Sequence, residues 1–131
     1  LNLKEKLQWH VNLKDHKRKV HLRKNSLLRA LNNLIDNADY YGSQIKVSIV
    51  EKQTLLLIHV EDNGPGITTD KIKDAVKPFV RLDDSRNLNK PHGVGLGLSI
   101  ASDLIKIHGG NLHLKKSKNL GGLKASLTLP L

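Results

Sequence analysis

The first group of residues whose types and spacing suggest a chemical role consists of three polar side chains at helical spacing. Asn33, Asn37 and Tyr41 stand at i, i+4 and i+8, on one helix face next to a stripe of leucines. Exposed helix faces usually carry lysine and glutamate, whereas an amide offers a neutral oxygen that completes the shell of a magnesium ion already bound to phosphates. Taken alone, however, two asparagines on a solvated surface explain the pattern better.

A carboxylate beside two glycines forms the second group. Asp62 follows the apolar run Leu55–Val60 and precedes Gly64 and Gly66 in the stretch "EDNGPGI". A carboxylate at the end of a strand can accept a hydrogen bond from an exocyclic amine, such as that of adenine. The simpler alternative is a turn that only connects a strand to a helix.

A glycine triplet opens a later helical pattern. Gly93, Gly95 and Gly97 alternate in "GVGLG", a spacing that differs from the G-x-G-x-x-G dinucleotide fingerprint and from the phosphate loop of P-loop proteins. Glycines nevertheless let backbone N–H groups approach an anion, and a helix N-terminus favours negative charge. A flexible loop with an accidental triplet is the alternative.

An aperiodic segment before these glycines contributes the fourth group. The only phenylalanine, Phe79, precedes Arg81–His92, which lacks apolar periodicity and carries Arg81 and Arg86. A large aromatic side chain can anchor such a loop. The two arginines can then fold over phosphates.

The helices that must position these groups follow from apolar periodicity. Leucine, isoleucine and alanine recur at helical spacing over Ser26–Tyr41, which predicts a helix capped by Asn25 or Ser26 and ended by Gly42. A second long helix is predicted over Gly97–His108. A short helix is expected from Thr68 or Thr69 through Val76.

The strands are predicted as two hairpins. "QIKVSIV" and "TLLLIHVED" flank a turn at Lys52 and Gln53, and "NLHLKK" and "LKASLTLPL" flank a turn at Gly121 and Gly122. "LQWHVNL" near the start alternates like a strand but remains ambiguous. This order predicts an α+β, two-layer sandwich whose mixed, mostly antiparallel sheet is covered on one face by helices.

Composition limits the remaining choices. The chain has 131 residues, no cysteine and a net charge of +10, and it has no methionine, so we expect a single domain cut from a longer protein. No apolar run approaches the ~20 residues that span a bilayer. The basic charge suits a polyphosphate, an acidic lipid or nucleic acid, but aromatic residues for base stacking are lacking, so we expect no nucleic-acid partner.

The motifs together resemble one family. The order of "NNLIDNADYYG", "DNGPGI", "PFVR", "GVGLGLSI" and "GGLKASLTLPL" resembles the ATP-binding catalytic domain of sensor histidine kinases, relatives of DNA gyrase, heat-shock chaperones and mismatch-repair ATPases. "PFVRLDDSRN" and "GGLKASLTLP" most resemble the osmosensor kinases of that family. The resemblance covers residues 23–131 and implies the Bergerat ATP-binding fold. Each motif is modest alone, but together in this order they are specific.

The resemblance implies an adenine pocket. Asp62 would bind the amino group of adenine, Gly64 and Gly66 would shape the adjoining wall, and Ile67 would line it. Tyr41 matches a residue that flanks the base.

The resemblance also implies a phosphate and magnesium site with ATP and Mg²⁺ as its ligands. Asn37 would ligate magnesium, and Asn33 would lie near the phosphates. Phe79, Arg81 and Leu82 would open a lid over ATP. The backbone at the start of the second long helix would wrap the phosphates, at positions Gly93, Val94, Gly95, Leu96, Gly97 and Leu98.

Three positions qualify this assignment. Thr128 is a weaker candidate for the adenine end of the pocket. Many members have a basic residue where this chain has Tyr40. Val76 replaces the first aromatic residue of the usual F-x-P-F motif before the lid.

The resemblance also bears on the reaction. Members that hydrolyse ATP carry a glutamate base where this chain has Asn33, and an amide does not take up a proton at neutral pH. We therefore expect phosphoryl transfer to a nucleophile from another domain, and we assign no catalytic residue with certainty. The histidines lack the sequence pattern of a phosphate acceptor: His10, His16, His21, His59, His92, His108 and His113.

The expected protein is therefore a kinase catalytic domain that phosphorylates a histidine on its own dimerisation domain. The parent would be a homodimer in a bacterial inner membrane that passes phosphate to a response regulator, with this domain cytoplasmic and monomeric alone. An anti-sigma-type serine kinase and a degenerate interaction module without nucleotide are the alternatives.

Overall fold

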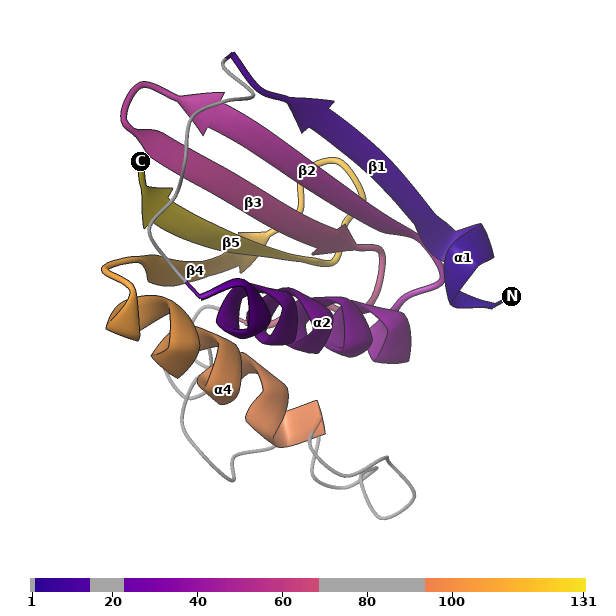
Figure 1. Ribbon diagram of the computed structural model, residues 1–131. Helices are drawn as coiled ribbons and strands as arrows, with labels where there is room; N and C mark the ends of the chain where they lie inside the picture. The colour runs from indigo at the N-terminus through magenta and orange to yellow at the C-terminus, as the bar shows by residue number, and fades with distance from the viewer. Residues whose placement is uncertain (1, 15–22, 69–93) are drawn as a thin grey trace.

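The computed structural model describes residues 2–14, 23–68 and 94–131. Its helices and strands follow one another along the chain (Figure 1) as α1 (Leu3–Lys6), β1 (Leu7–Asn12), α2 (Lys24–Tyr41), β2 (Ile45–Lys52), β3 (Leu55–Asp62), α4 (Val94–Ile107), β4 (Asn111–Lys116) and β5 (Leu123–Pro130). The predicted short helix through Val76 and the segment Arg81–His92 lie outside the described residues.

The strands form one five-stranded sheet in the order β1-β2-β3-β5-β4. β1 runs parallel to β2, with Trp9 opposite Val47, and the other three pairings are antiparallel. Both predicted hairpins are present, and Gln53 adopts a left-handed conformation (φ 56°) in the turn between β2 and β3. The prediction of a mixed, mostly antiparallel sheet is confirmed.

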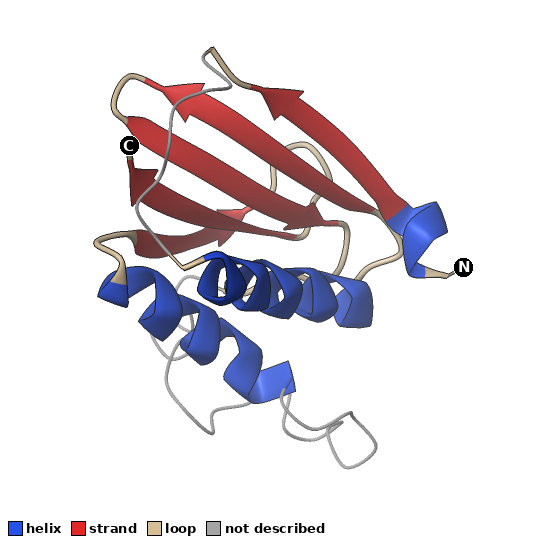
Figure 2. Cartoon of the chain, in the orientation of Figure 1, coloured by secondary structure: helices blue, strands red, loops and turns tan. Residues whose placement is uncertain are grey.

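The helix layer lies on one face of this sheet, where α2 and α4 pack against each other and against the strands (Figure 2). Side chains alternate between the two faces of a strand, so one set of strand residues meets the helices. Among the described residues, the core that results is entirely aliphatic. Its most deeply buried members include Ala30, Leu34, Ile45, Val47, Ala101, Ile105, Leu127 and Leu129.

Several boundaries differ from those predicted. Helix α2 begins at Lys24, so Asn25 and Ser26 already lie in its first turn, and Arg23 is an N-cap without a side-chain hydrogen bond. The predicted end is confirmed, since the Gly42 N–H donates to the carbonyl of Ala38 at 2.8 Å. The short helix α1 was not predicted, because four residues are too few for a periodic pattern.

Helix α4 starts at Val94, three residues before the predicted start at Gly97. Glycine lowers helix propensity by about 1 kcal/mol, which misled the sequence prediction. Helix α4 nevertheless packs against α2. A methyl group on Gly97 would lie 3.5 Å from the carbonyl oxygen of Asn33, an ordinary van der Waals distance, so Gly97 lies beside Asn33.

Candidate functional site

Asp62 is the most distinctive polar residue of the described chain. It ends β3 on the face that meets the helices and is only 2% exposed. Its Oδ1 accepts hydrogen bonds from the N–H groups of Gly64 (2.9 Å) and Leu123 (3.2 Å). Burial raises the pKa of this carboxyl above 3.8, and the two N–H donors partly offset that rise.

Glycines surround the Asp62 turn closely. A methyl group on Gly122 would lie 2.6 Å from the backbone nitrogen of Gly64, and one on Gly64 would lie 2.7 Å from the carbonyl oxygen of Tyr41. Gly66 adopts φ 73°, a conformation that glycine tolerates best. The turn is therefore held between the end of α2 and the chain before β5.

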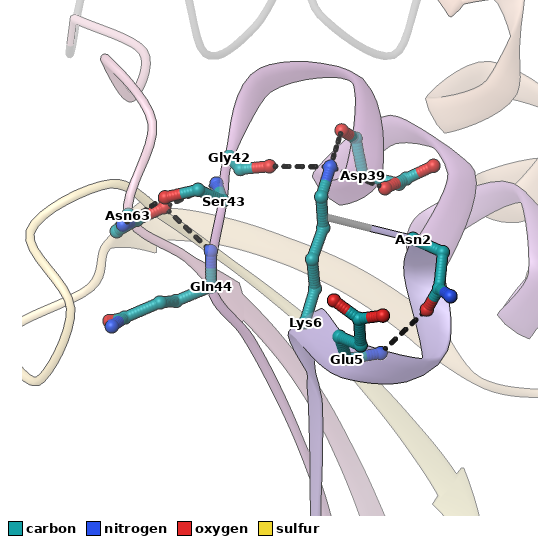
Figure 3. A network of polar contacts seen from close by, with 8 residues as sticks. All are labelled: Asn2, Glu5, Lys6, Asp39, Gly42, Ser43, Gln44 and Asn63. Atoms are coloured by element: carbon teal, nitrogen blue, oxygen red, sulfur yellow. Dashed lines mark hydrogen bonds and ion pairs between the residues drawn. The ribbon is translucent and has the colours of Figure 1, made fainter.

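Asn63 fixes the same turn from its other side (Figure 3). Its Oδ1 accepts hydrogen bonds from the N–H groups of Ser43 (2.8 Å) and Gln44 (3.0 Å), and its Nδ2 donates to Ser43 Oγ (3.0 Å). The residue after Asp62 is therefore fastened to the segment that follows α2.

Lys6 fastens α1 to the same end of α2 (Figure 3). Its ammonium lies 2.8 Å from Asp39 Oδ1 and 3.3 Å from the carbonyl oxygen of Gly42. A cation is favourable at a helix C-terminus because the free carbonyls there carry partial negative charge. The end of α2 thus joins the N-terminal segment to the turn that carries Asp62.

Two amides of α2 lie one turn apart on the same helix face. Asn37 is buried, at 7% exposed. Asn33 has a buried Nδ2 with no partner among the described residues. Buried polar groups are normally hydrogen-bonded, so the Asn33 amide fits a polar ligand.

Tyr41 lies one turn beyond Asn37 and is half-buried, and its ring meets that of Tyr40 edge to face, with centroids 5.0 Å apart. Tyr40 is 38% exposed, at the position where many members have a cation. Ile67 is half-buried and packs against the core. α2 and the turn after β3 therefore bring together Asn33, Asn37, Tyr41, Asp62, Gly64, Gly66 and Ile67.

Thr128 does not join this group. It lies on β5 five residues beyond Leu123, about 16 Å along the strand at ~3.3 Å per residue. It is opposite Leu57 on the face turned away from α2 and α4, and its Oγ1 donates to the carbonyl of Asn111 (3.4 Å). The prediction that Thr128 lies at the adenine end of the pocket is corrected, because the register of β5 places it elsewhere.

The remaining predicted residues belong to the lid and to α4. Phe79, Arg81, Leu82 and Gly93 lie outside the described residues. Of the glycine-rich entry to α4, Val94, Gly95 and Leu96 form the first turn, and Gly97 and Leu98 are buried. Gly97 brings this first part of α4 next to Asn33.

Sequence reasoning missed four residues that hold Asp62: Glu61, Ser117, Gly122 and Leu123. The glycine pair before β5 was interpreted only as a turn, and nothing in its local pattern shows that it contacts Asp62. A pairing prediction that aligned β3 with β5 would have found this contact.

Comparisons with known proteins agree with this arrangement. Residues 23–131 match the family model described as "Histidine kinase-, DNA gyrase B-, and HSP90-like ATPase". The chain is 35% identical over 105 residues to the sensor histidine kinase GtrS of Pseudomonas aeruginosa, covering 80% of this chain and 21% of that protein. It is also 35% identical over 108 residues to the sensor histidine kinase CpxA of Escherichia coli, covering 82% and 23% respectively.

Solved structures show the same likeness. The histidine kinase domain of the osmosensor EnvZ from E. coli is 33% identical, with a TM-score of 0.68 over 96% of this chain and 75% of that one. The mycobacterial sensor histidine kinase MprB, at 22% identity, shares the fold with a TM-score of 0.78 over 96% and 84% of the two chains.

The chain therefore belongs to the histidine kinase-, gyrase- and HSP90-like ATPase family, and within it to the ATP-binding catalytic domains of sensor histidine kinases. It spans about a fifth of the length of the curated relatives that it matches.

The described residues include no helix with the length and apolar character needed to cross a membrane. They also contain no cluster of three or more histidine, cysteine, aspartate or glutamate side chains suited to a metal ion.

Proposed function

We propose that this domain binds Mg-ATP and transfers the γ-phosphoryl group to a histidine on a separate dimerisation domain of a two-component sensor kinase. The observation that carries the proposal is Asp62, a buried carboxylate whose Oδ1 is held by the N–H groups of Gly64 and Leu123. A buried carboxylate is costly unless its oxygens are hydrogen-bonded. A ligand that donates to Oδ2 would add to the two donors on Oδ1.

In this proposal Asp62 accepts a hydrogen bond from the amino group of adenine. The fixed position of Oδ1 leaves Oδ2 as the acceptor, so the base is recognised in one orientation. Gly64 and Gly66 allow the base to approach the backbone, and Ile67 and Tyr41 supply apolar surface beside it. The two glycines therefore contribute to recognition of the base, because larger side chains on the turn would hinder its approach.

Asn37 is the residue that we propose as a magnesium ligand through its amide oxygen, and Asn33 is proposed to lie near the phosphates. Asn33 fits because its buried Nδ2 lacks a partner among the described residues, and Asn37 fits because it is buried one turn further along the same helix face. When bound, magnesium neutralises charge on the phosphate oxygens. The first turn of α4, which lies next to Asn33, offers backbone N–H groups to the same phosphates.

The reaction that follows best is transfer and not hydrolysis. An asparagine at position 33 cannot take a proton from water at neutral pH. An imidazole from another domain is already a nucleophile and has less need of a base. The partners are accordingly the kinase's own dimerisation domain and, through the parent protein, a response regulator. The parent is proposed to be a homodimeric membrane sensor with this domain on the cytoplasmic side.

Calorimetry with a non-hydrolysable ATP analogue tests the proposal. Binding should require Mg²⁺, and Asn37→Ala should remove most of that requirement while Asn32→Ala, on an exposed neighbouring position, should not. Absence of binding at millimolar nucleotide would refute the proposal and favour an interaction module without nucleotide, for which Tyr40 in place of a cation is the supporting observation. Incubation with labelled ATP should leave the isolated chain unlabelled.

A further inference from the structure

The loop between β4 and β5 (Ser117–Gly122) and the first residue of β5 supply two N–H donors that hold Asp62. The Gly122 N–H donates to the Asp62 carbonyl oxygen at 3.0 Å, and the next N–H, that of Leu123, donates to Oδ1 at 3.2 Å beside the donor from Gly64. Gly122 also lies so close to Asp62 that a side chain there would collide with it. The position of this loop therefore helps to set where the carboxylate lies.

Ser117 organises the loop. Its hydroxyl accepts the N–H of Leu120 (3.0 Å), its carbonyl accepts the N–H of Gly121 (2.8 Å), and its own N–H donates to the carbonyl of Gly122 (2.7 Å). The side chain is completely buried. These three bonds close the loop into a fixed turn around one serine.

Glu61 holds that serine from the sheet. Its carboxylate is 3% exposed, and Oε1 accepts hydrogen bonds from Ser117 Oγ (3.0 Å) and from the Asn119 side chain (3.4 Å). Glu61 immediately precedes Asp62, but alternation along β3 turns its side chain to the opposite face. A buried carboxylate is costly without donors, and these two bonds satisfy it within the loop.

We propose that Glu61 and Ser117 are positioning residues for nucleotide recognition, because they fix the β4–β5 loop that orients Asp62. This inference rests on the proposed function, in which Asp62 accepts the amino group of adenine. Neither residue touches the nucleotide. Their effect passes through Gly122 and Leu123 and should appear as selectivity for the amino group, not as affinity for nucleotides in general.

The test compares two nucleotides on the same chain. ATP and the triphosphate of purine riboside, which lacks the 6-amino group, are titrated by calorimetry in the presence of Mg²⁺. The wild-type chain should bind ATP about tenfold to a hundredfold more tightly than the analogue, because one hydrogen bond to a charged acceptor usually changes an affinity by that factor.

Ser117→Ala and Glu61→Ala should each reduce that preference by at least about threefold while leaving the affinity for the purine analogue unchanged. The double variant should lose no more than the worse single variant, since both act through one bond. Glu61→Gln should restore most of the preference, because an amide oxygen still accepts. Ser126→Ala is the matched control, a serine 6% exposed whose hydroxyl pairs with His59, and it should keep the wild-type preference.

The outcomes are distinguishable. A wild-type preference that survives in both Ser117→Ala and Glu61→Ala overturns the inference, as does an equal loss of affinity for both nucleotides. If Glu61→Ala fails to fold, Ser117→Ala decides, because it removes only one oxygen. A wild-type chain that binds both nucleotides equally refutes the role of Asp62 and this inference with it, whereas a chain that binds neither refutes the proposed function.

Discussion

Asp62 and His59 lie three residues apart on β3, yet they face opposite sides of the sheet. Asp62 meets the helix layer, where burial raises the pKa of its carboxyl. His59 lies on the face turned away from α2 and α4, where burial, followed by Lys124 and Lys115 against the opposing influence of Glu61, lowers the pKa of its imidazole. Both groups are thus displaced toward their neutral forms.

Asp62 and His59 differ in the partners that their polar atoms contact. His59 Nδ1 lies 2.7 Å from Ser126 Oγ, within the sheet itself. Oδ1 of Asp62 is held by backbone N–H groups from two separate segments, at Gly64 and Leu123. A displaced pKa is a poor marker of function on its own. A carboxylate fixed in this way at the end of a strand is the better marker.

The largest effect is expected from a substitution of Asp62, on the helix-facing side of the sheet. Asp62→Asn should weaken binding of a non-hydrolysable ATP analogue by about tenfold to a hundredfold, because the amide cannot reproduce a charged acceptor. The amide oxygen can still accept from Gly64 and Leu123, so the fold should persist. Calorimetry measures the loss. The control His59→Gln should bind normally, and an unchanged affinity in Asp62→Asn would contradict its role.

The second effect tests how tightly the Asp62 turn is enclosed. Gly122→Ala places a methyl group against Asp62 and Gly64, which should cost about 1–3 kcal/mol of unfolding free energy and most of the nucleotide affinity. Gly121→Ala is the matched control. It has φ 91° but nothing within 4 Å of the added methyl group, so it should cost about 1 kcal/mol and keep the affinity. Urea unfolding and calorimetry measure both, and equal losses in the two variants would sink the explanation.

The third effect is a pH dependence of opposite sign on the two faces. Asp62 has a raised pKa when folded, so its stabilising contribution is complete below 3.8 and is lost as the pH rises through the folded pKa. Asp62→Asn should therefore have a higher Tm than wild type at pH 7, and the gain should vanish toward pH 3.8. Melting curves across pH measure this difference.

His59 has a lowered pKa, so its contribution is complete above 6.5 and is lost as the pH falls through the folded pKa. His59→Gln does not titrate and should gain stability relative to wild type below pH 6.5. The same melting curves serve for both variants. If the stability gains of both variants changed in the same direction with pH, the proposed difference in pH dependence between the two faces would be wrong.

The smallest effect is expected from the ion pair of Lys6 with Asp39 at the end of α2, which belongs to neither face of the sheet. Lys6→Met should lower the unfolding free energy by about 0.5 kcal/mol, because Lys6 and Asp39 are partly exposed, at 16% and 37%. This corresponds to a fall in Tm of about 1–2 °C for a domain of this size. Lys4→Met, on an exposed position of the same helix, is the control and should melt like wild type. A larger fall in Lys4→Met would contradict the assigned contact.

Periodicity was sufficient for much of the fold. The leucine stripe of α2 and the alternation in both hairpins reflect burial against the core, which is a local pattern in the sequence. The start of α4 was predicted three residues late, because its glycines lower the local helix propensity, whereas the packing of α4 against α2 joins residues distant in sequence. The parallel pairing of β1 with β2 also depends on tertiary placement, not on local pattern.

The same limit applies to the site. Asn33, Asn37 and Asp62 carry recognisable chemistry at recognisable spacing, whereas Glu61 and Ser117 act through contacts between strands far apart in sequence. Thr128 shows the reverse error. Its residue type suited a pocket, but the pairing of Thr128 with Leu57 places it away from Asp62. Residue type can be read from sequence, while register requires the folded sheet.

The pairing of β3 with β5 also has a consequence for how the domain folds. The hairpins β2–β3 and β4–β5 are local, but Ile58 meets Leu127 across roughly 70 residues of sequence. Contacts of such long range form slowly because the intervening loop must close first. The Asp62 turn is held by Leu123 at the end of this pairing, so the site is complete only once this long-range pairing has formed. A nucleotide that needs the completed turn would then protect the whole domain against unfolding, and the gain in unfolding free energy would grow with the logarithm of its concentration relative to Kd.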